Sequence, residues 1–269
     1  MNTLPLISII SVCYNSEKDI AKTIESVLIQ TYRPLEYIIK DGKSTDNTLK
    51  IIDKYTNDFK EKGIELTVIS EKDNGIYDAM NKAIPFTKGK WINFMNADDL
   101  FINKDSIYNL FLEPLPLNTK IVYGDFLRKK KAYTKHFEGL SPEIIPKRMP
   151  SSHQAMFFER ESLIQNPYDT NYKFVADYHF IYKSFERGDC IICRHVDIAL
   201  CEAGKGFSAN NKLNVKKECA KVQGIDKSIN WEIIYFKQFV DITTKSFFHK
   251  VLPSPLLYII RQINHKRLA

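Results

Sequence analysis

The segment WINFMNADDLF, residues 91–101, joins a strongly apolar run to two adjacent carboxylates, Asp98 and Asp99. A run such as Trp91 to Met95 is typical of a strand inside a sheet. Carboxylates at the far end of such a strand lie at the rim of the sheet and not in the core. Because neighbouring acids repel each other, the segment predicts a shared cation at the end of a buried strand.

The composition is that of an ordinary folded protein. The 269 residues are 44% hydrophobic and 26% charged, which suits one large domain or two small ones and argues against disorder. The formal net charge is +7, but the basic residues are not interleaved along a nucleic-acid-binding motif, so no nucleic-acid partner is expected. Residues 4–12 lack the basic flank and cleavage site of a signal peptide, and no run reaches the roughly 20 apolar residues of a membrane-spanning helix.

The five cysteines are odd in number and scattered, which argues against a disulfide framework and favours a reducing compartment. Cys190 and Cys193 can be drawn as a zinc site with His195 and Cys201. The surrounding CIICRHVDIAL is instead β-branched and alternating, as in a strand, where Cys190 and Cys193 point to opposite faces. We therefore expect structural cysteines.

Strand and helix patterns alternate through the first half of the chain. Strands are predicted at residues 6–13, 35–40, 66–69 and 91–95, and helices at residues 16–30, from Ser44 or Thr45 to Tyr55, and at residues 76–86. This alternation predicts an α/β fold with a mostly parallel sheet and helices on both faces. Ligands of such sheets bind outside the carboxyl ends of the strands.

Unusual polar residues follow each of the four predicted strands: Tyr14 and Asn15, then Asp41, then Glu71 and Asp73, then Asn96, Asp98 and Asp99. Hard divalent cations prefer oxygen ligands, and Mg²⁺ commonly combines one or two carboxylates with substrate phosphates. Asp98 and Asp99 are therefore candidate ligands of a metal that holds a diphosphate. The sequence contains neither GxxxxGK[ST] nor GxGxxG, so a metal would take the place of a glycine-rich phosphate loop.

The ordered motifs SVCYN, DGKSTDNT, SEKDNGIYDAMNKAI and GKWINFMNADDLF resemble glycosyltransferase family 2. The resemblance is close over roughly the first half and looser beyond it. It implies the GT-A fold, a Rossmann-like, mostly parallel sheet with an acceptor-side segment and a C-terminal helical tail. It also implies an inverting enzyme that uses a nucleotide-sugar.

Carried over by position, the resemblance implies that Tyr14, Asn15 and Asp41 contact the nucleoside, with Asp41 accepting from the uracil ring of a UDP-sugar. The sequence Asn96, Ala97, Asp98 takes the place of the family's DxD motif. Because the first acid is an asparagine here, Asp98, with Asp99 beside it, is the expected ligand of Mg²⁺ or Mn²⁺. The Asn96 amide can bond a ribose hydroxyl or a metal-bound water.

Lys82 is expected to reach the donor phosphates. Each of these residues also has a structural alternative. Asp41 can belong to a turn, Asp98 and Asp99 can cap the helix that starts near Lys104, and Lys82 can be a solvated charge. The ordered set is more specific than any single member.

An inverting transfer needs a base that takes the proton from the acceptor hydroxyl. Asp177, in FVADYHFIYKSF, matches the position of the family's catalytic acid at the start of an amphipathic helix, and we predict that it is the base. A carboxylate that only stabilises the helix N-terminus is the alternative, and His153 is the rival base. We place His153 and Gln154 in the sugar or acceptor pocket, with a core histidine as the alternative.

The last part of the chain carries two further expectations. GKGFS, residues 204–208, resembles the family's flexible loop that closes over the diphosphate, or is a plain turn. The segment VLPSPLLYIIRQINHKRLA joins an apolar patch to basic residues and suits an anionic membrane surface. The same residues can instead pack on the catalytic domain or on another subunit.

The predicted organisation is a GT-A catalytic domain at residues 1–210 and a helical, basic segment at residues 211–269. Residues 1–100 form the nucleotide-sugar half of the catalytic domain and residues 101–210 the acceptor half. We expect a cytoplasmic protein, peripheral on the inner face of the cell membrane through the C-terminal segment.

The predicted function is a metal-dependent inverting glycosyltransferase that moves a sugar from a UDP-sugar to a hydroxyl of a glycan acceptor. The expected acceptor is a polyprenyl-diphosphate-linked intermediate of bacterial surface polysaccharide, O-antigen or capsule. A nucleotidyltransferase is one alternative, but it would favour a basic, glycine-rich loop where SVCYNSEKD stands. The other is a catalytically silent sugar-nucleotide binding module, which would not depend on Asp177.

Overall fold

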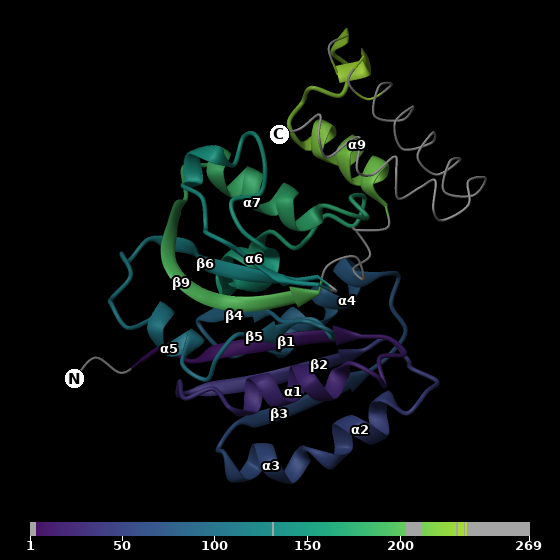
Figure 1. Ribbon diagram of the computed structural model, residues 1–269, viewed down its shortest axis with the longest axis vertical. Coiled ribbons are helices and arrows are strands. Elements are labelled where there is room, and N and C mark those ends of the chain that lie inside the picture. Colours follow the sequence, from purple (N-terminus) through teal and green to yellow (C-terminus); the bar gives the residue numbers. More distant parts are fainter. Residues whose placement is uncertain (1–3, 131, 203–210, 230, 234, 236–269) are drawn as a thin grey trace. The chain divides into compact units, whose positions relative to one another are not determined.

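The computed structural model describes residues 4–130, 132–202, 211–229, 231–233 and 235 (Figure 1). The chain divides into two compact units, Met1–Asn211 and Lys212–Ala269. In the second unit the described part includes helix α9 (Lys212–Val222). The predicted loop at residues 204–208 and the segment VLPSPLLYIIRQINHKRLA lie outside the described residues. Across the described ranges, no helix has both the length and the hydrophobicity to cross a membrane.

The first unit is built on one mixed sheet. Within the described chain it contains nine strands: β1 (Ile7–Cys13), β2 (Leu35–Asp41), β3 (Glu65–Ser70), β4 (Trp91–Phe94), β5 (Leu100–Phe101), β6 (Thr119–Lys129), β7 (Thr134–Phe137), β8 (Met156–Glu159) and β9 (Cys190–Glu202). Their order is β3-β2-β1-β4-β8-β6-β9-β5, and β7 pairs with β6. Strands β3, β2, β1 and β4 are mutually parallel, and β8 is antiparallel to both β4 and β6. Figure 1 shows β9, which is parallel to β6, as a long curved strand.

Helices cover both faces of this sheet. One hydrophobic core includes residues of α1 (Ile20–Leu28), α2 (Thr48–Lys54), α3 (Thr56–Glu61) and α5 (Ser106–Leu110). The other includes residues of α4 (Ile76–Ala83), α6 (Arg160–Gln165) and α7 (Ala176–Glu186). Short 3-10 turns occur at Ile84–Phe86, Pro142–Ile144 and His153–Ala155. The prediction of an α/β fold with helices on both faces of the sheet is therefore confirmed.

The alternation of side chains along β1 explains why two cores form. Ile7 and Ile9 belong to one core, while Ile10 and Val12 belong to the other, as expected when successive residues of a strand point to opposite faces. All seven residues of β1 are buried. A strand with both faces covered needs this nearly continuous apolar sequence.

Two predicted helices are shorter in the structure than the sequence suggested. The first begins at Ile20 instead of residue 16, because Ser16 belongs to a turn in which its carbonyl accepts from the backbone N–H groups of Asp19 and Ile20. The second begins at Thr48, because Asp46 Oδ1 accepts from the Thr48 N–H at 2.9 Å and so keeps the preceding residues in a loop. Aspartate commonly makes such bonds two residues along the chain.

The five cysteines are free. Cys190 and Cys193 lie on β9, as the strand prediction required.

A buried carboxylate fixes the entry of the chain into β4. Glu36 is only 3% exposed, and its Oε1 accepts from Ser8 Oγ at 2.5 Å, from the Lys88 N–H at 2.5 Å and from the Gly89 N–H at 3.0 Å. These bonds tie β1 and β2 to the turn before β4. Buried donors that lose their acceptor destabilise a fold by about 1–3 kcal/mol each.

We predict that Glu36→Ala lowers the free energy of unfolding by about 3 kcal/mol, because three donors lose one acceptor. In thermal unfolding followed by circular dichroism, this corresponds to a fall in melting temperature of about 6–12 °C. The matched control is Glu65→Ala, because Glu65 is the register partner of Glu36 on β3 but has an exposed side chain paired with Lys88. Equal losses in the two variants would contradict the assignment.

Candidate functional site

Backbone hydrogen bonds place the ends of the four parallel strands side by side. After β4, the Met95 N–H donates to the Ile10 carbonyl at 2.9 Å and the Ala97 N–H to the Val12 carbonyl at 3.3 Å. On the other side of β1, the Gly42 N–H donates to the Cys13 carbonyl at 2.8 Å. The polar residues that follow these strands therefore share one edge of the sheet, where α/β folds bind their ligands.

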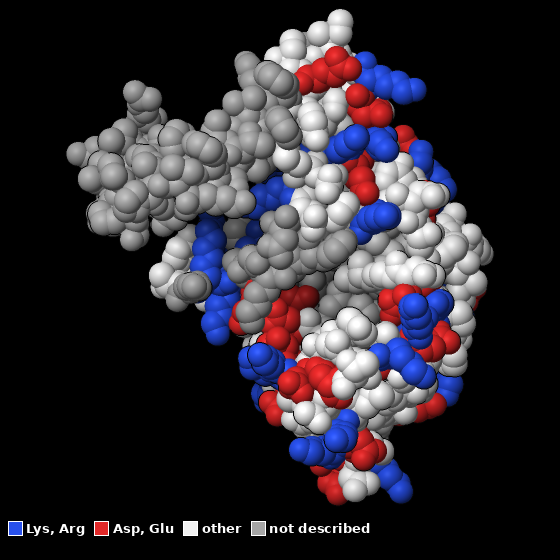
Figure 2. All heavy atoms as spheres, turned by 90° about the vertical axis from the view of Figure 1, so that its right-hand side faces the viewer, with Lys and Arg blue, Asp and Glu red and all other residues white. Residues whose placement is uncertain are grey.

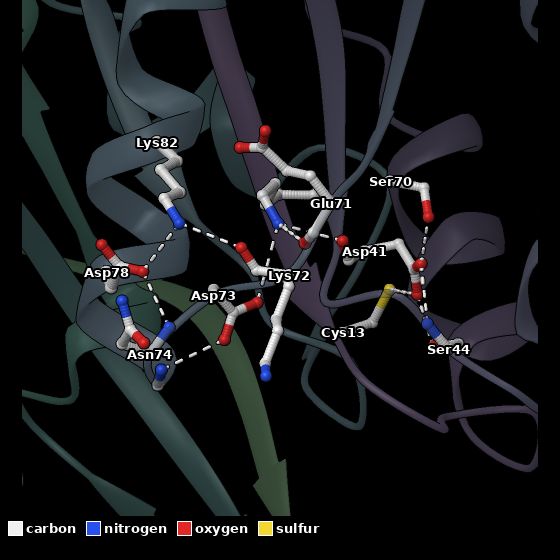
Figure 3. A network of polar contacts seen from close by, with 12 residues as sticks. Cys13, Asp41, Ser44, Ser70, Glu71, Lys72, Asp73, Asn74, Asp78 and Lys82 are labelled. Atoms are coloured by element: carbon white, nitrogen blue, oxygen red, sulfur yellow. Dashed lines mark hydrogen bonds and ion pairs between the residues drawn. The ribbon is translucent and has the colours of Figure 1, made fainter.

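Asp41 ends β2 and organises the loop that follows it (Figure 3). Its side chain is fully buried. Oδ2 accepts from the Ser44 N–H at 3.0 Å and from Ser70 Oγ at 2.7 Å, and Oδ1 accepts from Ser44 Oγ and, at 3.9 Å, from Cys13 Sγ. Both carboxylate oxygens thus bind donors of the chain itself, so any contact with a nucleobase has to share them.

Tyr14 and Asn15 follow β1 and play different parts. The Tyr14 side chain is 62% exposed, and its ring offers an open flat surface. Asn15 Oδ1 accepts from the Thr45 N–H at 2.9 Å, which joins the loops after β1 and β2. A Cβ on Gly42 would lie 3.4 Å from the Tyr14 Cβ and only 2.7 Å from Asp73 Oδ2. A side chain at residue 42 would therefore push the Tyr14 and Asp73 side chains away from each other.

Two lysines hold the loop that follows β3. Lys40 has no exposed surface, and its Nζ donates to the carbonyls of Asp41 at 2.9 Å and Glu71 at 2.6 Å and lies 3.6 Å from Asp73 Oδ2. Lys82, on α4, pairs with Asp78 at 3.0 Å and donates to the Lys72 carbonyl at 3.0 Å (Figure 3).

Lys40 was not among the residues predicted from the sequence to form the site. In the sequence, Lys40 stands out only as a charged residue at the end of the apolar strand LEYIIK. A buried ammonium requires charged or carbonyl partners, but the sequence alone does not show which ones.

The turn after β4 presents Asp98 and Asp99. Thr23 Oγ1, on α1, donates to the Asp99 carbonyl at 3.0 Å and accepts from the Asp98 N–H at 3.2 Å. Asp98 has a φ of +92°, a backbone conformation that non-glycine residues rarely adopt. The fold therefore holds this aspartate in a strained conformation at the sheet edge.

Gln154 and Cys201 reach the same turn. Gln154 Nε2 donates to Asp99 Oδ2 at 2.6 Å, and the Cys201 thiol is a hydrogen-bond partner of the same carboxyl. Burial, helped by the charge of Asp98, raises the pKa of Asp99 to about 7, against the lowering effect of the hydrogen bonds from Gln154 and Cys201. A second negative charge is thus unfavourable at this turn without a cation.

Asn96 supplies an independent observation at the same turn. Among the described residues, its Oδ1 is buried and has no hydrogen-bond partner. Buried polar atoms are rarely left in this state unless a ligand, a water or an ion completes them. Two carboxylates and an amide oxygen are hard ligands that suit Mg²⁺ or Mn²⁺. The residues at this turn therefore fit a divalent cation.

Asp177 lies in the first turn of α7 and is paired with a tyrosine that the sequence analysis missed. Its Oδ1 accepts from Tyr77 Oη at 2.7 Å and from the Tyr178 N–H at 2.9 Å. Tyr77 is on α4, 100 residues earlier in the chain, so sequence spacing gave no signal of the contact. The pairing brings the predicted base against the nucleotide half of the domain.

His153 lies in an aromatic core and not on an open surface. It is 7% exposed, its ring stacks on Phe94 with centroids 5.3 Å apart, and its Nε2 bonds Tyr168 Oη at 2.9 Å. Burial lowers the pKa of His153, although the nearby Asp177 opposes this shift. Its neighbour Gln154 contacts Asp99, so the two residues that were predicted together differ in their surroundings.

On the face drawn in Figure 2, acidic and basic side chains alternate over the lower part. That part of the surface shows no continuous basic stripe of the kind that binds nucleic acid.

Comparisons with known proteins agree with this geometry. A PGL/p-HBAD biosynthesis glycosyltransferase of Mycobacterium bovis is 27% identical over 223 residues, which are 81% of this chain and 83% of that protein. An Escherichia coli UDP-Glc:alpha-D-GlcNAc-diphosphoundecaprenol beta-1,3-glucosyltransferase is 37% identical over 102 residues, or 37% of this chain and 38% of that protein.

Two solved structures share the fold at low sequence identity. The mannosyltransferase PcManGT of Pyrobaculum calidifontis, in complex with GDP-Man and Mn²⁺, has a TM-score of 0.67 at 15% identity and is matched over 100% of this chain and 82% of that one. S. aureus TarS 1–349, in complex with UDP-GlcNAc, has a TM-score of 0.60 at 19% identity over 80% of this chain and 66% of that one.

The family model described as "Glycosyl transferase family 2" matches residues 8–168, more than half of the chain. This span includes β1 from its second residue, β2 to β4 and the turn with Asp98 and Asp99. The chain therefore belongs to glycosyltransferase family 2 and has its GT-A fold.

Proposed function

We propose that this glycosyltransferase moves a sugar from a UDP-sugar to a hydroxyl of a glycan acceptor, with inversion at the anomeric carbon. The observation that carries the proposal is the turn of Asn96, Asp98 and Asp99 beside the end of β1, where Tyr14 is exposed. A base-stacking surface and a cation site at one edge are what a nucleoside diphosphate requires. The E. coli relative is named for UDP-Glc, and the S. aureus structure holds UDP-GlcNAc.

In this proposal the loops after β1 and β2 bind the nucleoside. The exposed ring of Tyr14 stacks on the base, since every nucleobase has a flat face that an aromatic ring can cover. Asp41 bonds Ser44 and Asn15 bonds Thr45, which keeps the two loops in place. To contact the uracil, an Asp41 oxygen has to accept a further hydrogen bond beside those from its donors in the chain. Lys82, which bonds Asp78 and the Lys72 carbonyl, has a third N–H to offer a phosphate.

The cation of the proposed reaction would be held by Asp98 and Asp99. When bound, Mg²⁺ or Mn²⁺ neutralises charge on the leaving diphosphate. The residues themselves contribute position: Thr23 fixes the backbone of the turn, and Gln154 orients the Asp99 carboxyl. Asn96 Oδ1, which is buried and has no partner among the described residues, is the acceptor that a ribose hydroxyl or a metal-bound water would complete.

Asp177 is the proposed general base. Its carboxylate takes the proton of the acceptor hydroxyl while the hydroxyl oxygen forms a bond to the anomeric carbon and the bond to the diphosphate breaks, releasing UDP. Tyr77 donates to Oδ1, which orients the carboxylate and leaves Oδ2 for the acceptor. An α-linked donor would give a β-linked product.

The proposed acceptor is a lipid-linked intermediate of bacterial surface polysaccharide, in which the sugar chain is carried on a polyprenyl diphosphate. The E. coli relative is named for an undecaprenol-diphosphate acceptor, and the mycobacterial relative for PGL/p-HBAD biosynthesis. We place the enzyme on the cytoplasmic side of the membrane, where such an acceptor would meet a nucleotide-sugar.

We expect UDP to bind tightly only when Mn²⁺ and Asp98 are both present, because the cation joins the carboxylate to the diphosphate. Calorimetry with UDP, GDP and CDP, with and without Mn²⁺, measures this, and Asp98→Ala should weaken UDP binding at least tenfold. Asp53→Ala, an exposed carboxylate on α2, is the matched control. If UDP affinity is the same without Mn²⁺ and in Asp98→Ala, the proposed donor site has no basis.

We expect Asp177→Asn to lower kcat about 10²- to 10⁴-fold, the usual contribution of a general base, while UDP affinity stays within twofold. Turnover of UDP-sugars and calorimetry on the same variant provide the two readouts. Glu186→Gln, at the other end of α7, should leave both unchanged. Full activity in Asp177→Asn would show that another group takes the proton, and a wild-type protein that binds UDP but turns over no sugar would favour a silent binding module.

The acceptor class is tested by presenting the same short glycan free and on a polyprenyl diphosphate in detergent. We expect kcat/KM to be at least tenfold higher for the lipid-linked form, because uncharged free glycan lacks the diphosphate and the chain. Equal kcat/KM values for the two acceptors would contradict a lipid-linked substrate without affecting the proposed donor site.

A further inference from the structure

A second group of potential metal ligands lies on the far strands of the sheet. Asp125 on β6, His136 on β7 and Asp197 on β9 bring one carboxylate oxygen or ring nitrogen each to within 4.8 Å of one another. The strand pairing explains this approach: Asp125 and Asp197 are register partners, and His136 is the partner of Leu127, two residues beyond Asp125. The group could not be predicted from the sequence because its members come from three different strands.

This group is separate from the turn of Asp98 and Asp99. Asp99 contacts Cys201 on β9, whereas Asp197 is four residues earlier on the same strand. At about 3.3 Å per residue in a parallel strand, these positions are roughly 13 Å apart. One cation cannot bind both groups.

The distances suit a small divalent cation. His136 Nε2 lies 2.7 Å from Asp197 Oδ1 and 3.8 Å from Asp125 Oδ2. Ligands about 2.0–2.1 Å from a tetrahedral Zn²⁺ are about 3.3 Å from each other, which falls between these two values. His195 Nδ1 lies 3.3 Å from Asp125 Oδ1 but does not belong to the group of three. Two carboxylates and one imidazole favour Zn²⁺ over Mg²⁺.

The charges also favour a bound cation. The Asp125 side chain is only 6% exposed, and the backbone donor that bonds it is the Gly139 N–H at 2.7 Å. Asp125 and Asp197 place two carboxyl groups side by side, and the His136 ring nitrogen faces both. A buried carboxylate needs a compensating positive charge, and one divalent cation balances both acids.

We propose that Asp125, His136 and Asp197 form a binding site for Zn²⁺ or a similar transition-metal ion, distinct from the donor site. Bound there, the ion joins β7 to β9 and so fixes the hairpin of β6 and β7. That hairpin exposes Lys129, Lys130 and Lys135, and the ion holds its base against the rest of the sheet. Gly139, which bonds Asp125, supports the site from the chain that follows β7.

The test is titration of the metal-depleted, full-length protein with ZnCl₂ in calorimetry, without nucleotide. We expect one equivalent of Zn²⁺ to bind and His136→Ala to weaken this binding at least tenfold. Asp197→Asn is the second variant, since its side chain is 46% exposed and the substitution should not disturb folding. His179→Ala, a histidine of α7 outside the group, and Asp98→Ala should bind Zn²⁺ as the wild type does.

Cysteines are the competing ligands for Zn²⁺, so Cys193→Ser is included. Loss of Zn²⁺ binding in Cys193→Ser but not in His136→Ala would overturn the proposal in favour of a thiol site. Loss in Asp98→Ala would show that Zn²⁺ was bound at the donor site, and absence of stoichiometric binding to the wild type would leave the group as hydrogen-bonded surface charges. Any of these three results contradicts the proposal.

Trypsin cleavage after Lys130 and Lys135 gives a readout independent of affinity. We expect saturating Zn²⁺ to slow cleavage in this hairpin severalfold in the wild type and to have no effect in His136→Ala. Equal protection of the two proteins by Zn²⁺ would contradict a role of the ion in joining β7 to β9.

Discussion

The parallel pairing of β4, β1, β2 and β3 is the constraint on which the site depends. Parallel strands end on the same side, so the residues after each of them are forced into one row. Backbone bonds such as that from the Gly42 N–H to the Cys13 carbonyl continue the pairing past the strands themselves. Polar loops that are distant in sequence therefore meet without needing contacts of their own to bring them together.

The buried polar groups at this edge are of two kinds: some have their hydrogen-bond partners within the chain, and others do not. Lys40 and Asp41 are buried and each has several partners from the chain. They stabilise the fold and need nothing from outside. Asn96 Oδ1 is buried without a partner among the described residues, and burial raises the pKa of Asp99. The Asn96 acceptor and the Asp99 carboxyl, and not the fully bonded groups, are the features on which the proposed ligand site rests.

Sequence reasoning predicted the strands well because a strand covered on both faces has a nearly continuous apolar sequence, as in residues 91–95. It also identified the turn of Asp98 and Asp99, because acids after such a run have no place in a core. Helix ends were less predictable: the bond from Thr48 to Asp46 competes with the helix and depends on local geometry.

Contacts between distant strands and helices could not be predicted at all. The pairing of Tyr77 with Asp177 spans 100 residues, and the group of Asp125, His136 and Asp197 exists only because β6, β7 and β9 are neighbours. The periodicity of apolar residues in the sequence does not show which distant strands and helices become neighbours. The placement of His153 among aromatic rings likewise follows from packing, since HQ before a strand suits a pocket or a core equally well.

The backbone of Asp98 has a consequence for the evolution and engineering of this protein. A φ of +92° costs a residue with a side chain about 1–2 kcal/mol, a cost that glycine avoids. Asp98→Gly should therefore relieve strain while removing the carboxylate, so selection for thermal stability alone would favour loss of the proposed metal ligand. An aspartate that persists at this position under mutation is maintained by activity and at the expense of stability, which is the pattern expected of a functional residue.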